Sequence, residues 1–93
     1  MPVVNPINCM SRIASKAGLS EKVKRRALTI LKSANELEIT AGKDPMGLAA
    51  SALYLSCVMS GENTTQRVIA QAAGVTEVTI RNRCKGLKES LKI

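Results

Sequence analysis

The sequence predicts an all-α fold, with five helices in one domain spanning residues 1–93. Apolar residues recur at spacings of three and four, as they do on one face of a helix, and the alternation typical of strands is absent. Glycine and proline divide the chain into five such segments. Because one Tyr is the sole aromatic residue, the core must be built from Leu, Ile, Val, Ala and Met, which suits closely packed helices.

The first two predicted helices are amphipathic. Asn5 can cap the first helix, Pro6 can occupy its first position, and Gly18 supplies the stop. Its apolar stripe consists of Ile7, Met10, Ile13, Ala14 and Ala17. Ser20 caps the second helix, which is predicted over residues 21–39. The stripe of that helix consists of Val23, Ala27, Ile30, Leu31, Ala34 and Leu37.

Positive charge is concentrated off the stripe of the second helix. The basic residues there are Lys22, Lys24, Arg25, Arg26 and Lys32. They belong to a net charge of +7, from 14 basic and 7 acidic residues, which favours a polyanionic partner, nucleic acid first and an anionic membrane second. The charges on this helix either form a solvated face or attract a phosphate backbone at long range, and the sequence leaves both interpretations open.

The third predicted helix, residues 46–60, should lie in the middle of the fold. Asp44 can cap it, Pro45 opens it, and Gly61 ends it. It is apolar nearly all round, which is typical of a helix with neighbours on every side. Its uncharged stretch of about fourteen residues is too short to span a bilayer, so we expect no membrane partner.

The fourth predicted helix is short and covers residues 65–73, ending at Gly74. Asn63 or Thr64 can cap it, and Asn63 with Gln66 three residues later resembles a capping box. A short helix, a turn with glycine and a further helix match the helix-turn-helix arrangement.

The fifth predicted helix begins after Thr76 and runs towards Ile93, with one apolar and one polar face. Its inward face should consist of Ile80, Cys84, Leu87 and Leu91. The opposite face of its first two turns carries Val78, Arg81, Asn82 and Lys85. Arg83 departs from the helix-turn-helix pattern, because an apolar residue is usual at that position.

This outward face has the chemistry for reading bases in the major groove of DNA. Arg81 suits a bidentate contact to guanine, Asn82 suits adenine or a phosphate, and Val78 offers apolar contact to a thymine methyl. Thr65, Gln66 and the first amides of the fourth helix are candidate phosphate contacts, and Lys85 is another. The alternative is that both helices are ordinary packing helices with a solvated basic side.

The composition argues against catalysis and metal binding. The chain has no His, and Cys9, Cys57 and Cys84 are widely spaced with no Cys-x-x-Cys. We therefore expect three reduced thiols, no metal, no cofactor and no enzyme activity.

Four segments of the chain together resemble the second cyclin-like repeat of the TFIIB family, in its archaeal form TFB. They are "NPINCMSRIASKAGLSEKVKRRALTIL", "AGKDPMGLAASALYLSCV", "TQRVIAQAAGV" and "TEVTIRNR". The resemblance implies a five-helix cyclin-like fold with a C-terminal helix-turn-helix. It also implies promoter DNA, TATA-binding protein and RNA polymerase as partners, and an intracellular, nucleoid-associated location.

The same resemblance implies specific DNA contacts. In the family, the last two helices contact the B recognition element upstream of TATA, and the Val and Arg of the "VTIR" motif map onto Val78 and Arg81. The basic residue of "GKDP" maps onto Lys43, a candidate phosphate contact. Many archaeal relatives have Tyr where Cys84 stands. Family members also carry a zinc ribbon, a linker and a first repeat, so we expect an excised domain in which Met1 is an added start.

Two other functions stay open at the level of sequence. One is a stand-alone helix-turn-helix regulator, although no spare apolar helix is available for a dimer, so we expect a monomer. The other is a cyclin-box module that binds a protein, with the basic surplus incidental.

Overall fold

The computed structural model describes residues 6–36, 45–62 and 64–91 of the chain. The described part contains five helices and no strand, which confirms the all-α prediction. The helices are α1 (Pro6–Ala17), α2 (Glu21–Glu36), α3 (Pro45–Ser60), α4 (Gln66–Ala73) and α5 (Glu77–Leu91). The predicted end of the second helix, at residues 37–39, lies outside the described residues.

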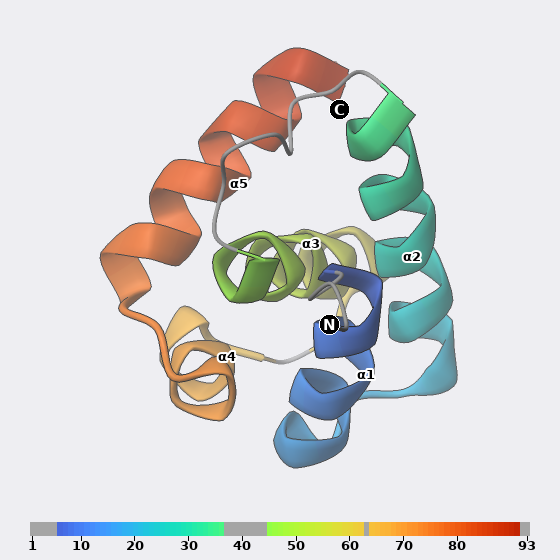
Figure 1. Cartoon of the computed structure of the whole chain (residues 1–93). Coiled ribbons are helices and arrows are strands. Elements are labelled where there is room, and N and C mark those ends of the chain that lie inside the picture. The colour runs from blue at the N-terminus through green and yellow to red at the C-terminus, as the bar shows by residue number, and fades with distance from the viewer. Residues whose placement is uncertain (1–5, 37–44, 63, 92–93) are drawn as a thin grey trace, which may run out of the picture.

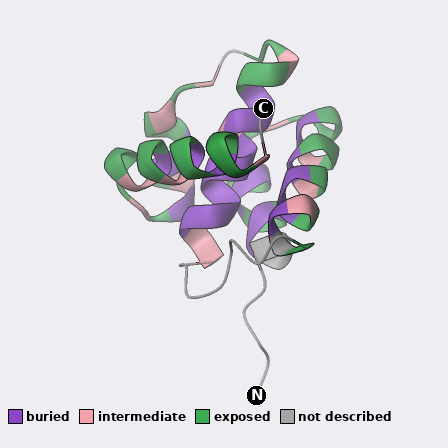
Figure 2. Ribbon diagram, turned by 90° about the horizontal axis from the view of Figure 1, so that it is seen from above, coloured by how far each residue is buried: buried purple, intermediate pink, exposed green. Residues whose placement is uncertain are grey.

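Helix α3 lies at the centre of the molecule, as its apolar sequence predicts. Figure 1 shows it nearly end-on, with the other four helices around it, and it contacts each of them. Ten of its sixteen residues are buried, in one unbroken series except for Tyr54. Figure 2 shows the contrast with the surrounding helices, which are exposed on their outer sides.

The core is aliphatic and is built from the predicted stripes. Helices α1 and α2 bury every described member of those stripes except Ala17, which is half-buried. The buried apolar residues of these two helices are Cys9, Met10, Ile13, Ala14, Val23, Ala27, Ile30, Leu31 and Ala34. On α3, alanines with no exposed surface allow neighbouring helices to approach closely, at Ala49, Ala50 and Ala52.

Two buried serines on α3 supply hydrogen bonds between helices. The Ser56 hydroxyl donates to the carbonyl of Val23 on α2, at 2.6 Å. The Ser51 hydroxyl lies 2.7 Å from the carbonyl of Gly47 in its own helix and 3.3 Å from that of Ile80 on α5. Buried hydroxyls require such partners, so both serines also fix where α2 and α5 lie along α3.

Short turns join the helices where the structure describes the connection. Gly61 ends α3 with φ of 74°, a left-handed conformation that favours glycine. The Glu62 amide then donates to the Cys57 carbonyl at 2.9 Å. Among the described residues, no helix is both long and apolar enough to cross a membrane.

Candidate nucleic-acid interface

Helices α4 and α5 are joined by a tight turn at Gly74. Its φ of 72° and ψ of 29° are left-handed, and the next amide, that of Val75, donates to the Ala70 carbonyl at 3.0 Å. Val75 is half-buried and packs on the core, while Ala70 is only 5% exposed. The predicted glycine turn between the last two helices is therefore present, with Val75 packed on the core and the small residue Ala70 buried beside it.

The cap of α4 differs from the prediction. Thr65, and not Thr64, is the capping residue: its side-chain oxygen accepts from the Val68 amide at 3.2 Å. Asn63, the other predicted cap, lies outside the described residues. As a result α4 begins at Gln66, one residue later than predicted.

The inward face of α5 is the predicted one. Ile80, Cys84 and Leu87 are buried, and Leu91 is half-buried against the core. The Cys84 thiol donates to the Ser51 carbonyl on α3 at 3.4 Å. Burial raises the pKa of this thiol to about 11, so it stays protonated at neutral pH.

The first turn of α5 is fixed by Thr76. The Thr76 hydroxyl oxygen accepts from the Thr79 amide at 3.2 Å, and the two threonine hydroxyls lie 2.9 Å apart. This cap satisfies an amide that the helix itself leaves unpaired.

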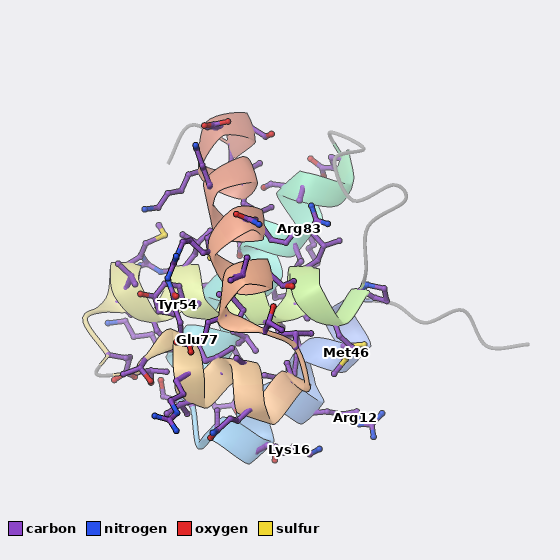
Figure 3. All side chains as sticks on the ribbon, turned by 90° about the vertical axis from the view of Figure 1, so that its left-hand side faces the viewer. Arg12, Lys16, Met46, Tyr54, Glu77 and Arg83 are labelled. Atoms are coloured by element: carbon purple, nitrogen blue, oxygen red, sulfur yellow. The ribbon has the colours of Figure 1, made fainter. Side chains whose placement is uncertain are left out.

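The four predicted outward residues of α5 are all exposed. Val78 has 58% of its surface exposed, and Arg81, Asn82 and Lys85 lie on the same side of the helix. None of the four side chains makes a hydrogen bond or ion pair with another described residue. Figure 3 looks directly onto α4 and α5, with Glu77 marking the start of α5. This part of the surface is free to receive a ligand.

The candidate phosphate contacts fall in three places. Thr65 is exposed and Gln66 half-buried, both at the start of α4, whereas Lys85 lies on α5 with the base-contact candidates. The capping role of Thr65 uses an oxygen lone pair and leaves its hydroxyl hydrogen free to donate. Lys43 lies outside the described residues.

Sequence reasoning missed one exposed group on α4. Arg67 and Val68 are both exposed, with 43% of the Val68 surface accessible. An apolar residue beside a basic one, just after a helix start, repeats the combination seen at Val78 and Arg81. That repeat was visible in the sequence and adds Arg67 and Val68 to the exposed residues of the helix-turn-helix.

Arg83 lies on the flank of α5, half-buried, at the position where the sequence pattern is unusual (Figure 3). Its Nε is buried without a hydrogen-bond partner among the described residues. Arg83 is therefore not one of the exposed residues on the outward face of α5.

The part of the chain that the structure describes holds no group of three or more metal-ligating side chains. The three cysteines are free and buried. Burial also raises the pKa of Cys57. Thiols in this state are poor ligands and poor nucleophiles at neutral pH.

Comparison with known proteins relates the whole fold to one family. Residues 1–90 match the family model described as the transcription factor TFIIB repeat. The chain is 54% identical over all its 93 residues to "Transcription initiation factor IIB" of Pyrodictium occultum, and 52% identical to that of Pyrobaculum aerophilum. It is 51% identical over 90 residues, 97% of the chain, to that of Pyrococcus furiosus.

The chain spans 28–30% of the length of these three relatives. The family-model match covers α1 to α4 and all of α5 except its last residue, and so includes the helix-turn-helix. This chain belongs to the TFIIB repeat family.

Proposed function

We propose that this chain binds promoter DNA during transcription initiation, with α5 in the major groove. The observation that carries the proposal is the exposed set Val78, Arg81 and Asn82 on a helix whose opposite face is buried. Exposing a valine to this extent gives no stability in water. Against DNA the same side chain gains a partner, because a thymine methyl is apolar.

The target of this face is the B recognition element upstream of TATA. Arg81 reads guanine through O6 and N7, Asn82 reads adenine or holds a phosphate, and Val78 contacts thymine. Three different side chains on adjacent turns select a short sequence, which is what a promoter element requires. The Val and Arg of the "VTIR" motif in the family resemblance are two members of this set, Val78 and Arg81.

Phosphate contacts fix the register of the helix on the duplex. Lys85 supplies a charge beside the base-reading residues, and Thr65 and Gln66 lie at the start of α4, where amides and the helix dipole favour an anion. Lys43 is a further phosphate contact in this proposal. The net charge of +7 adds a sequence-independent attraction.

The partners in this proposal are TATA-binding protein and RNA polymerase. The relatives are named as transcription initiation factors, and this chain corresponds to a portion of them that includes the helix-turn-helix. The chain acts beside TATA-binding protein on the promoter and helps to recruit the polymerase. Its role is binding, not catalysis.

A mobility-shift assay tests the proposal on two duplexes that differ only upstream of TATA. One carries a purine-rich element and the other carries the same bases scrambled, each with and without TATA-binding protein. We expect preferential binding to the first duplex, and a larger shift when TATA-binding protein is present. Equal affinity for both duplexes under all conditions would contradict base reading.

A salt titration of the same complex separates DNA binding from binding of a protein through apolar surface. Phosphate contacts release counterions, so affinity should fall steeply and linearly in log–log form as salt rises. A complex held by apolar burial would change little over the same range.

A further inference from the structure

A second surface of the molecule has binding chemistry of its own. A groove of about 710 Å³ runs along α2, beside the C-terminal ends of α3 and α5. It is lined by Glu21, Lys22, Arg25, Arg26, Thr29, Ile30, Ser33, Met59 and Leu91. None of these residues belongs to the candidate DNA-contacting set. In Figure 1, α2 and α5 lie on opposite sides of α3, although the two helices also contact each other.

Apolar side chains from three helices form one part of this groove. They are Ile30 of α2, Met59 of α3 and Leu91 of α5. Met59 has 46% of its surface exposed, and Leu91 is half-buried. Ile30 is only 5% exposed, so Met59 and Leu91 supply most of the accessible apolar surface. Two such side chains from separate helices in one concave site form a surface that gains from being covered. Methionine adapts readily to the shape of an incoming side chain.

Positive charge borders the same groove. The side chains of Lys22, Arg25 and Arg26 are exposed on α2 and make no hydrogen bond or ion pair with another described residue. The one acidic residue in the lining, Glu21, is paired with Lys24 at 2.7 Å, and this pairing lowers its pKa. The charge of Lys24 offsets that of this exposed carboxylate, so Lys22, Arg25 and Arg26 give the groove a net positive charge.

We propose that this groove binds an acidic amphipathic segment of a partner protein. Its apolar side chains pack on Met59 and Leu91, and its carboxylates pair with Lys22, Arg25 and Arg26. An amphipathic helix laid in an apolar groove is a recurring form of peptide recognition. Charge complementarity selects an acidic segment over a neutral one and speeds its association.

Two other occupants fit the lining less well. A DNA backbone would satisfy the cations but would leave Met59 and Leu91 without apolar partners. A second copy of this chain would bring a net charge of +7 against another of +7, and like charges oppose that approach.

Three labelled synthetic peptides test the proposal by fluorescence anisotropy. The first carries Glu and Asp with Leu at helical spacing, the second has the leucines replaced by Gln, and the third has the acidic residues replaced by Lys. We expect saturable binding of the first peptide, binding at least about tenfold weaker for the second, and none for the third. Equal binding of the first two peptides would overturn the proposal, because charge alone would then explain the signal.

Matched variants locate the site. Arg25→Glu with Arg26→Glu should weaken the first peptide by at least about tenfold, and Met59→Gln should weaken it by several-fold. The control is Arg12→Glu with Lys16→Glu, which changes the net charge equally at two exposed residues of α1, outside the groove (Figure 3). An equal loss of peptide affinity in the control variant would overturn the assignment of the site to this groove. Displacement of the bound peptide by a short duplex DNA would overturn it as well.

Two further measurements keep the result interpretable. Circular dichroism should show that every variant retains the helical content of the unchanged chain. The Met59→Gln variant should keep its preference between the matched and scrambled duplexes, since Met59 lies outside the proposed DNA interface. If the unchanged chain does not bind the first peptide but still prefers the matched duplex, only the groove proposal fails. If it binds the peptide but shows no preference between the duplexes, only the DNA-reading proposal fails.

Discussion

Helices α3 and α5 are nearly equal in length but differ in how much of their surface is buried. Ten of the sixteen residues of α3 are buried, whereas three of the fifteen residues of α5 are buried. Packing therefore constrains α3 on almost every side. On α5 it constrains one stripe and leaves the opposite face free. Packing therefore does not account for which residues stand on the outward face of α5. For this reason we propose that they bind a ligand.

The largest expected effect is on α3, where Leu53 has no exposed surface. Leu53→Ala should lower the free energy of unfolding by about 2–5 kcal/mol, because it removes buried methyl groups and leaves a cavity. Urea denaturation followed by circular dichroism measures this. Val78→Ala on α5 is the control and should change stability by no more than about 0.5 kcal/mol. Similar losses in the two variants would break the comparison between the helices.

The next effect is on DNA selectivity and comes from Arg81. Arg81→Ala should reduce discrimination between matched and scrambled duplexes by about 1–3 kcal/mol, because one bidentate base contact is lost. Non-specific affinity and unfolding should stay nearly unchanged. Lys88→Ala, at another exposed basic residue of α5, is the matched control. A parallel loss on both duplexes would indicate that Arg81 holds a phosphate.

A smaller effect is expected at Lys85, one turn beyond Arg81. Lys85→Ala should lower affinity about equally on all duplexes and should reduce the slope of log affinity against log salt by about 1. Mobility shifts at several salt concentrations measure both. A loss confined to the matched duplex would assign Lys85 to base reading.

The smallest expected effect is on the pH dependence of stability and comes from Cys84, where α5 meets α3. It is absent at neutral pH, where the thiol is protonated in both the folded and the unfolded chain. The pKa of this thiol is about 11 in the folded chain, against an ordinary value of 9.0. Because the unfolded chain loses the proton first, the free energy of unfolding should fall as pH rises above about 9. Chemical denaturation of the unchanged chain and of Cys84→Ala, at neutral pH and near pH 10, measures the difference. Parallel pH profiles would contradict burial of the thiol as the cause.

Much of this architecture could be predicted from the sequence, because periodicity reports burial directly. The central place of α3 and the inward stripe of α5 both follow from where apolar residues recur. The turn at Gly74 follows from the conformational freedom of glycine. In each case the structure follows from residues close together in the sequence, either the spacing of apolar side chains or a single glycine.

The remaining features depend on contacts that sequence does not specify. Asn63, Thr64 and Thr65 all have capping side chains, so composition could not decide between them, and the structure assigns the role to Thr65. The bond from Ser56 to Val23 joins residues 33 apart and exists because of how two helices cross. The groove beside α2 likewise requires the ends of α3 and α5 to lie together.

If α5 reads DNA as proposed, its attachment to α3 has a consequence for how a new sequence preference can arise. The Ser51 hydroxyl on α3 lies within hydrogen-bond distance of the Ile80 carbonyl, and the Ser51 carbonyl accepts from the Cys84 thiol. Both contacts are on the buried side of α5, so they hold this helix against α3. Substitutions at Val78, Arg81 or Asn82 exchange the side chains in front without disturbing that support. Under the proposed function, exchanging these three side chains would change the bases that α5 selects while the packing behind the helix stays the same.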